Sequence, residues 1–270
     1  MIERHFHDLI VDGKSLADFG VHVSGTGVFN SPERDYEVVE VPGRSGDLLF
    51  SKNRYKNYEL TYPAFVLYHF REKIAELRAF LLSRKGYVRI EDTYHPDEFR
   101  LGYFQGPLEF DPILLTGSEF EIKFNVKPQR FLKYGETVQT FAPPAVDLTR
   151  TFTINNPTYF ESKPLIKIYR TTTSLDPSTS TDIVHKLEIG NCGLNIMETG
   201  TTNIIIDSEL MDVHDETNLN LNNRVQRVQM VADLEDPFLE ISPGLVNCKV
   251  TNFNSSTVSK IEITPRWYTL

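Results

Sequence analysis

Short segments in which apolar and polar residues alternate recur along the chain, and this period of two is what most restricts its fold. The clearest example is 119–126: Phe120, Ile122, Phe124 and Val126 face one way, and Glu121, Lys123 and Asn125 face the other. Such alternation is typical of strands with one buried face. Further strands are predicted in the first half at 5–11, 35–41, 58–65, 86–91 and 100–109. The chain is therefore expected to be mainly β.

One segment has the period of a helix instead. From about residue 66 or 69 to residue 84, apolar residues recur at steps of three and four: Leu67, Phe70, Ile74, Leu77 and Leu81. These side chains form one apolar stripe, and Gly86 follows as a stop signal. We expect a single helix here, within the strand-rich first domain.

The second half has short strands and no helical period. Seven strands are predicted there, at 151–155, 164–170, 183–189, 203–207, 225–231, 247–252 and 259–264. Strands of this length and spacing favour a β-sandwich. The segment 134–147 lacks periodicity and contains Pro143-Pro144, which favours an extended link. The expected organisation is a domain at 1–133, a linker at 134–147 and a β-sandwich at 148–270.

Composition restricts the function. The chain has 270 residues and a net charge of −9, with 28 basic against 37 acidic side chains. Sequence-independent DNA binding needs a basic surface, so this class is excluded. We expect a soluble protein, because no stretch reaches the ~20 apolar residues of a membrane-spanning helix. The N-terminus also lacks the apolar run of a signal peptide, so the mature chain is expected to start at Met1. Cys192 and Cys248 are too few for a disulfide scaffold, and Cys248 is interpreted as a core residue.

Catalytic motifs are absent from the sequence. It has no H-E-x-x-H, G-x-S-x-G or phosphate-loop pattern. His5 and His7 could share a metal on one strand face, although no second pair of ligands accompanies them. An acidic cluster could bind a hard cation but lacks the glycine spacing of a calcium loop; it comprises Asp207, Glu209, Asp212, His214, Asp215 and Glu216. We therefore predict a protein that is not an enzyme and needs no cofactor or metal.

The segment 38–62 is interpreted as a connector, which means a segment that contacts another surface. Two strand-like runs, 38–41 and 58–62, flank a charged, glycine-rich turn. Pro42-Gly43 fits the central positions of a type II turn, because proline presets φ and glycine accepts a positive φ. A turn this open cannot enclose a pocket but can hydrogen-bond another surface. The alternative is an ordinary exposed hairpin. The candidate residues for an oligomer interface are Gly43, Arg44, Gly46, Asp47, Arg54 and Tyr55.

Motifs along nearly the whole chain resemble the distal tail proteins (Dit) of long-tailed phages. The turn carries PGRSGDL at 42–48, followed by NRYKN at 53–57. Other segments fall in the order seen in that family: IVDGKSLADFGV at 10–21, KPQRF at 127–131, NPTYFESKPLIKI at 156–168, IIDSE at 205–209, PGLVN at 243–247 and ITPRW at 263–267. None is specific alone, and the resemblance rests on their succession.

The resemblance implies an N-terminal ring-forming β domain and a C-terminal galectin-like β-sandwich. It further implies a virion protein, made in the bacterial host cytoplasm, that forms a homohexameric ring at the distal end of the tail. Such a ring joins the tail tube protein to a tail-tip or tail-associated protein, can carry host-receptor-binding proteins, and leaves a channel through which DNA passes without specific binding. The alternative is an adhesion module that binds host cell-wall saccharides through the C-terminal sandwich. Trp267, the single tryptophan, is interpreted as packing onto that sandwich and not as a sugar platform.

Overall fold

The computed structural model describes residues 7–24, 28–67, 70–114, 117–142, 149–170, 183–197, 203–217, 219–229, 238–253 and 258–270. Within these ranges the chain is mainly β with one α-helix, as predicted. It divides into two compact units, residues 1–131 and residues 132–269. His5 and the segment 171–182 lie outside the described residues.

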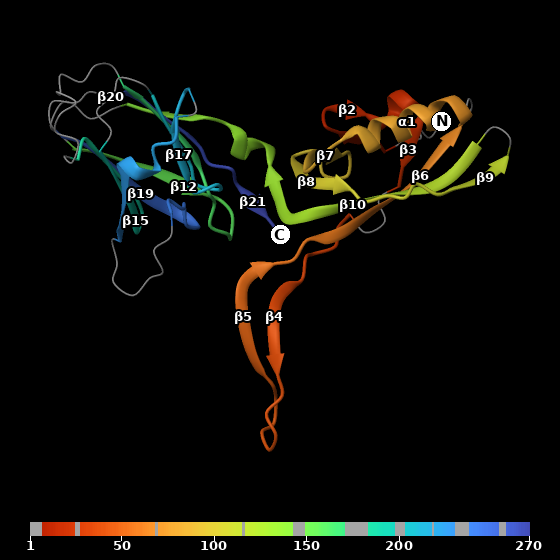
Figure 1. Ribbon diagram of the computed structural model, residues 1–270, viewed down its shortest axis with the longest axis horizontal. Helices are drawn as coiled ribbons and strands as arrows, with labels where there is room; N and C mark the ends of the chain where they lie inside the picture. The colour runs from red at the N-terminus through yellow and green to blue at the C-terminus, as the bar shows by residue number, and fades with distance from the viewer. Residues whose placement is uncertain are drawn as a thin grey trace. The chain divides into compact units, whose positions relative to one another are not determined.

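The first unit is built on one antiparallel sheet (Figure 1). Its strands are β1 Leu9–Val11, β2 Lys14–Ser15, β3 Val21–Val23, β6 Tyr58–Leu67, β7 Val88–Asp92, β8 Glu98–Phe104, β9 Phe110–Leu114 and β10 Gly117–Leu132. The order across the sheet is β2-β1-β7-β8-β10-β6-β3, and β9 also pairs with β10. A 3-10 helix, η1 Leu16–Phe19, connects β2 to β3.

The predicted alternation in β10 is confirmed. Phe120, Ile122, Phe124 and Val126 are buried, and β10 pairs with β6 from Gly117↔Leu67 to Val126↔Tyr58. The helix α1, Phe70–Ser83, contributes Ile74, Leu77 and Leu81 to the same core. The period of 3.6 thus buries one side of α1 against the sheet.

The first unit also contains a second, two-stranded sheet, which lies between β3 and β6 along the chain. It consists of β4 Arg34–Val39 and β5 Leu48–Tyr55, and neither strand pairs with any other strand of the described residues (Figure 1). The sequence predicted a hairpin here, but with 58–62 as its second strand. That pairing is wrong, because Val38 lies opposite Leu49 while Tyr58 belongs to β6 in the large sheet. The alternation of 58–62 indicates a strand with one buried face. Of the two sheets in the first unit, the large sheet has a core that can bury this face, and the two-stranded sheet has none within the described residues.

The second unit consists of two five-stranded antiparallel sheets, ordered β11-β20-β13-β16-β17 and β12-β19-β14-β15-β18. Their bounds are β11 Gln139–Phe141, β12 Thr149–Asn156, β13 Leu165–Arg170, β14 His185–Ile189, β15 Cys192–Ile196, β16 Ile204–Asp207, β17 Asp212–Asp215, β18 Val225–Gln229, β19 Gly244–Asn252 and β20 Val258–Thr264. The unit also holds β21 Tyr268–Thr269 and two 3-10 helices, η2 Lys133–Glu136 and η3 Asn222–Arg224. Apolar side chains from both sheets form a single core, which is the arrangement of a β-sandwich.

The segment expected as a linker contains a strand. Within 134–147, β11 pairs with β20 from Gln139↔Ile263 to Phe141↔Ile261. Just before it, Gly135 lies so close to Trp267 that an added Cβ would be 2.5 Å from the Trp267 backbone nitrogen. Residues 134–142 therefore belong to the second unit. Three residues are too few to produce a detectable alternation, and Pro143-Pro144 lies outside the described residues.

Both cysteines are buried in the sandwich core, as expected for Cys248. Ile189 on β14 lies opposite Cys192 of β15 on one side and opposite Cys248 of β19 on the other, so a whole strand separates the two thiols. Burial raises the pKa of Cys248 to about 12. This thiol is a structural side chain and not a nucleophile at neutral pH.

Candidate assembly interface on the hairpin

The tip of the β4–β5 hairpin has the turn that the sequence predicted. The Arg44 N–H donates to the Val41 carbonyl at 3.2 Å, and Gly43 has a φ of +83°. Gly46 has the same φ, and a Cβ at either glycine would meet nothing within 4 Å. The glycines are therefore required by the backbone conformation and not by crowding. The tip is open and can be approached by another molecule.

Both faces of the hairpin carry exposed apolar side chains. Val38 and Leu49 lie opposite each other and project from one face, whereas Phe50, the next residue, projects from the other. Their exposed fractions are 55%, 64% and 56%. Two strands alone have no core, so these side chains remain in water unless a partner covers them. We refer to Tyr36, Val38, Leu49 and Phe50 as the apolar hairpin residues.

The base of the hairpin is closed by an ion pair. Asp35 is buried and accepts from Arg54 Nε at 2.8 Å and from Arg54 Nη2 at 2.7 Å, while Lys52 Nζ lies 3.7 Å away. The hydrogen bond from Arg54 lowers the pKa of Asp35. Next to this pair, the Arg34 guanidinium lies 5.1 Å from the centre of the Tyr55 ring. These contacts join β4 to β5 at the end of the hairpin nearest the large sheet.

The six residues predicted for an oligomer interface fall into two groups. Gly43, Arg44, Gly46 and Asp47 lie at the tip, whereas Arg54 and Tyr55 lie at the base. Leu48 and Arg54 are about 20 Å apart along the chain at the rise of a β-strand. The six residues do not form one site, because Arg54 and Tyr55 make contacts within the hairpin itself. The sequence analysis did not identify the apolar hairpin residues as interface candidates. The apolar run Leu48-Leu49-Phe50, directly after the charged turn, is the feature of the sequence that could have indicated them.

The metal-binding alternatives are not supported among the described residues. No group of three or more His, Cys, Asp or Glu side chains there could hold a metal. His7 shares a hydrogen bond of 3.2 Å with Thr93 and stacks on Tyr94 with ring centres 3.8 Å apart. The members of the acidic cluster bind separate partners: Asp207 with Arg266, Asp212 with Asn222, Asp215 with Thr217 and Glu216 with Lys167. The cluster is a set of structural contacts in the second unit.

Trp267 is buried in the core of the second unit, as the sequence indicated. An aromatic platform for a sugar would have to come from elsewhere. Tyr159 is 92% exposed, and its neighbour Phe160 stacks on Tyr268 with ring centres 5.7 Å apart. None of the described helices is long and apolar enough to cross a membrane.

Comparison with known proteins gives a match by structure alone. The sequence matches no protein-family model and no curated protein. Among solved structures, the chain is similar to the Dit protein of phage SPP1, which is described as a paradigm of the hub adsorption apparatus in phages that infect Gram-positive bacteria. The TM-score is 0.68 at 13% identity, and the match covers 98% of this chain and 100% of that one. The similarity predicted from the sequence motifs is confirmed at the level of the fold: the chain has the fold of a Dit distal tail protein.

Proposed function

We propose that this protein is a structural component of a phage tail, built as a homohexameric ring that joins the tail tube to the host-adsorption tip. The observation that carries the proposal is the match to SPP1 Dit over 98% of the chain. An alignment of this extent includes both units, whereas a shared sandwich alone would cover about half of the chain. The proposed partners are a tail tube protein, a tail-tip protein and, on the outside, receptor-binding proteins.

The hairpin is proposed as one half of the contact between neighbouring copies. Val38 and Leu49 on one face and Phe50 on the other offer exposed apolar surface, and no other strand of the described chain lies beside them. Burying apolar surface contributes about 25 cal/mol for each Å², so a hairpin inserted against a second copy would stabilise the assembly. A head-to-tail contact of this kind closes into a ring when its rotation divides a full turn.

A net charge of −9 suits a protein that surrounds DNA without holding it. DNA is retained by basic side chains that displace its counterions, and an acidic wall repels it instead. We propose that DNA passes through the ring without specific binding. Reversing acidic residues on the channel wall should slow genome ejection.

Native mass spectrometry of the full chain tests the ring. The expected particle has six times the 31.0 kDa mass of one chain. Leu49→Ser should shift the population toward single chains while leaving the circular dichroism spectrum unchanged, because Leu49 contributes to no core of its own chain. The matched control is Leu245→Ser, since Leu245 is a strand leucine with 71% exposure in the second unit. A wild-type protein that stays a single chain at high concentration would overturn the proposal.

The charged tip supplies an independent test of the same interface. Substituting Arg44 and Asp47 together should give folded single chains if the tip hydrogen-bonds the next copy. An intact ring would assign the contact to the apolar hairpin residues alone.

The carbohydrate-binding alternative rests on the exposed Tyr159. An aromatic ring that faces water is a typical platform for a sugar, whereas the other aromatic candidate, Trp267, is buried. Binding of the full chain on a glycan array, lost in Tyr159→Ala, would favour this function. Ring formation without sugar binding would favour the tail hub.

A further inference from the structure

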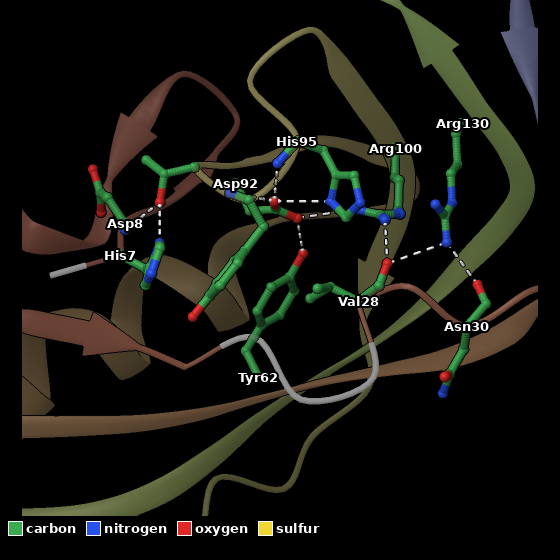
Figure 2. Close-up of polar contacts among 11 residues, drawn as sticks. His7, Asp8, Val28, Asn30, Tyr62, Asp92, His95, Arg100 and Arg130 are labelled. Carbon is green, nitrogen blue, oxygen red and sulfur yellow. Dashed lines mark hydrogen bonds and ion pairs between the residues drawn. The ribbon is translucent and has the colours of Figure 1, made fainter. Parts of the chain in front are cut away.

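The chain segment that enters the hairpin is held by two arginines from the sheet of the first unit. Arg100 on β8 donates through Nη2 to the Val28 carbonyl at 2.8 Å. Arg130 on β10 donates through Nη2 to the same carbonyl at 3.1 Å and to the Asn30 carbonyl at 2.7 Å. Figure 2 shows the two guanidinium groups converging on Val28 from different strands. The contacts are to backbone oxygens, so they fix the path of the chain.

Arg100 is itself held in place by a buried carboxylate. Its Nη1 donates to Asp92 Oδ2 at 2.9 Å, and the Tyr62 hydroxyl donates to the same oxygen at 2.7 Å. Only 1% of Arg100 and 4% of Asp92 are exposed. The other carboxylate oxygen accepts from the backbone N–H groups of Tyr94 and His95. A buried ion pair needs hydrogen bonds on both partners, and these contacts orient the Arg100 guanidinium between Asp92 and Val28, although its Nε is buried without a hydrogen-bond partner among the described residues (Figure 2).

The pKa of Asp92 agrees with this geometry. Burial by itself raises the pKa of a carboxyl, but the hydrogen bond from Tyr62 and the charge of Arg100 outweigh burial and lower the pKa of Asp92. The carboxylate is therefore ionised at neutral pH, and the pair with Arg100 is intact.

The two ends of the hairpin are anchored differently. On the β5 side the chain runs directly into β6, whose backbone pairs with β10 along the sheet. On the β4 side Arg34 lies only a few residues after Asn30, a reach of at most about 14 Å. The Lys56 N–H donates to the Glu33 carbonyl at 2.9 Å and closes the base between them. The arginine contacts at Val28 and Asn30 therefore hold the chain to strands of the large sheet just before the Glu33–Lys56 contact at the base of the hairpin.

We propose that Arg100 and Arg130 are positioning residues for assembly: by holding the carbonyls of Val28 and Asn30, they fix the direction in which the hairpin extends from the large sheet of the first unit. The proposal rests on the proposed function, in which the hairpin contacts a second copy. A hairpin that pivots at its base presents the apolar hairpin residues in many orientations, and this freedom has to be lost when the ring forms. If the two arginines already hold the segment before the hairpin in the single chain, less orientational freedom is lost when the ring forms, and the entropic cost of assembly is smaller.

Arg130 allows a test that spares the buried ion pair, because its contacts are with Val28 and Asn30 and not with Asp92. Arg130→Met removes both hydrogen bonds to the carbonyls, whereas Arg130→Lys keeps the charge and can still donate to one of them. The matched control is Arg78→Met, at an exposed position on α1. Amide hydrogen exchange measures opening of the segment 28–57, and native mass spectrometry measures assembly. Exchange should be compared in a Leu49→Ser background, where all variants are single chains and assembly cannot protect the amides.

The expected result is exchange about tenfold or more faster across 28–57 in Arg130→Met, partial recovery in Arg130→Lys and no change in Arg78→Met. In the background without the Leu49 substitution, Arg130→Met should dissociate at protein concentrations at which the wild type remains assembled. The circular dichroism spectrum should not change. Unchanged exchange would overturn the proposal, and so would faster exchange with assembly equal to that of the wild type. A wild type that never assembles is a different result, because it rejects the proposed function before any Arg130 variant is compared.

Discussion

Replacing Arg100 with methionine should destabilise the first unit strongly. Methionine is an unbranched side chain without charge, so Asp92 would remain ionised and buried with only neutral donors and the partly buried His95 around it. Removing one partner of a buried ion pair typically costs about 3–5 kcal/mol, mostly because the remaining charge is left without compensation. The lost hydrogen bond to the Val28 carbonyl adds about 1 kcal/mol to that loss. We expect a total near the upper end of the range.

The two units can be followed separately during unfolding. The protein has a single tryptophan, and Trp267 is buried in the core of the second unit. Tryptophan fluorescence in a urea titration therefore reports the second unit, while far-ultraviolet circular dichroism reports both. Arg100→Met should move the dichroism transition of the first unit to lower urea and leave the fluorescence transition in place. The Leu49→Ser background keeps assembly from adding its own concentration dependence.

A double variant measures how much of the lost stability comes from the interaction between Asp92 and Arg100 itself. In Asp92→Asn with Arg100→Met, no uncompensated charge remains, and the Tyr62 hydroxyl can still donate to the amide oxygen introduced at position 92. The double variant should be more stable than the sum of the single variants predicts, with a coupling of about 1–3 kcal/mol. The pKa of Asp92 is lower in the folded state than in the unfolded chain, where it is about 3.9. The ion pair therefore makes its full contribution to the free energy of unfolding above the unfolded pKa. This contribution is lost as the pH falls through the folded pKa. The difference between wild type and Arg100→Met should therefore shrink below about pH 4. A loss of less than about 1 kcal/mol at pH 7 would refute the reasoning that this pair is shielded from water.

Three further predictions concern the second unit. Gly135→Ala should lower the urea midpoint of the Trp267 fluorescence transition, because the new Cβ would lie 2.5 Å from the Trp267 backbone nitrogen. Overpacking of this kind reduces the free energy of unfolding by about 1–3 kcal/mol. An unchanged midpoint would contradict the close contact between residues 135 and 267. Burial alone raises the pKa of Asp207, but its hydrogen bonds with Arg266 outweigh that effect and lower it, so its contribution is lost in acid as the pH falls through the folded pKa. In Asp207→Asn, the free energy of unfolding of the second unit should fall less steeply as the pH is lowered. A fall as steep as that of the wild type would show that other carboxyl groups cause the loss of stability in acid. Cys248, with a pKa of about 12, should resist alkylation by iodoacetamide in mildly alkaline buffer in the native protein and react in urea, as read by peptide mass; labelling of the native protein would show that its strand opens.

The hairpin shows where sequence reasoning succeeds and where it fails. The turn at Pro42-Gly43 was predictable because proline and glycine act through their own backbone angles. The partner of Val38 was not, because 48–55 and 58–62 both supply strand residues and alternation does not identify a partner. Leu49 and Phe50 were missed for a related reason: adjacent apolar residues at the start of β5 point to both faces, so this strand has no period of two. Their exposure became evident only when no other strand of the described chain was found beside them.

Arg100 illustrates the same limit within the core. Its position in a predicted strand was correct, but an arginine in a strand is ordinarily exposed. Nothing near it in the sequence indicates that it is buried with Asp92, eight residues away, or that it binds the carbonyl of Val28, 72 residues away. The motif KPQRF contains Arg130 and contributed to the resemblance, although its contact with Asn30 spans 100 residues.

The sequence by itself determined the local structure of this protein: the mainly β character, the turn at Pro42-Gly43, the buried faces of strands such as β10 and the existence of a single helix, whose observed bounds are 70–83 and whose predicted stripe residue Leu67 lies in β6. These follow from the period of side chains and from backbone preferences, which act over a few residues. Only the tertiary structure decided that 134–142 joins the second unit, that β4 pairs with β5, and that Arg100 and Arg130 bind backbone carbonyls in the segment that precedes the hairpin. Each of these depends on contacts between distant segments, whose energies exist only once the chain has folded.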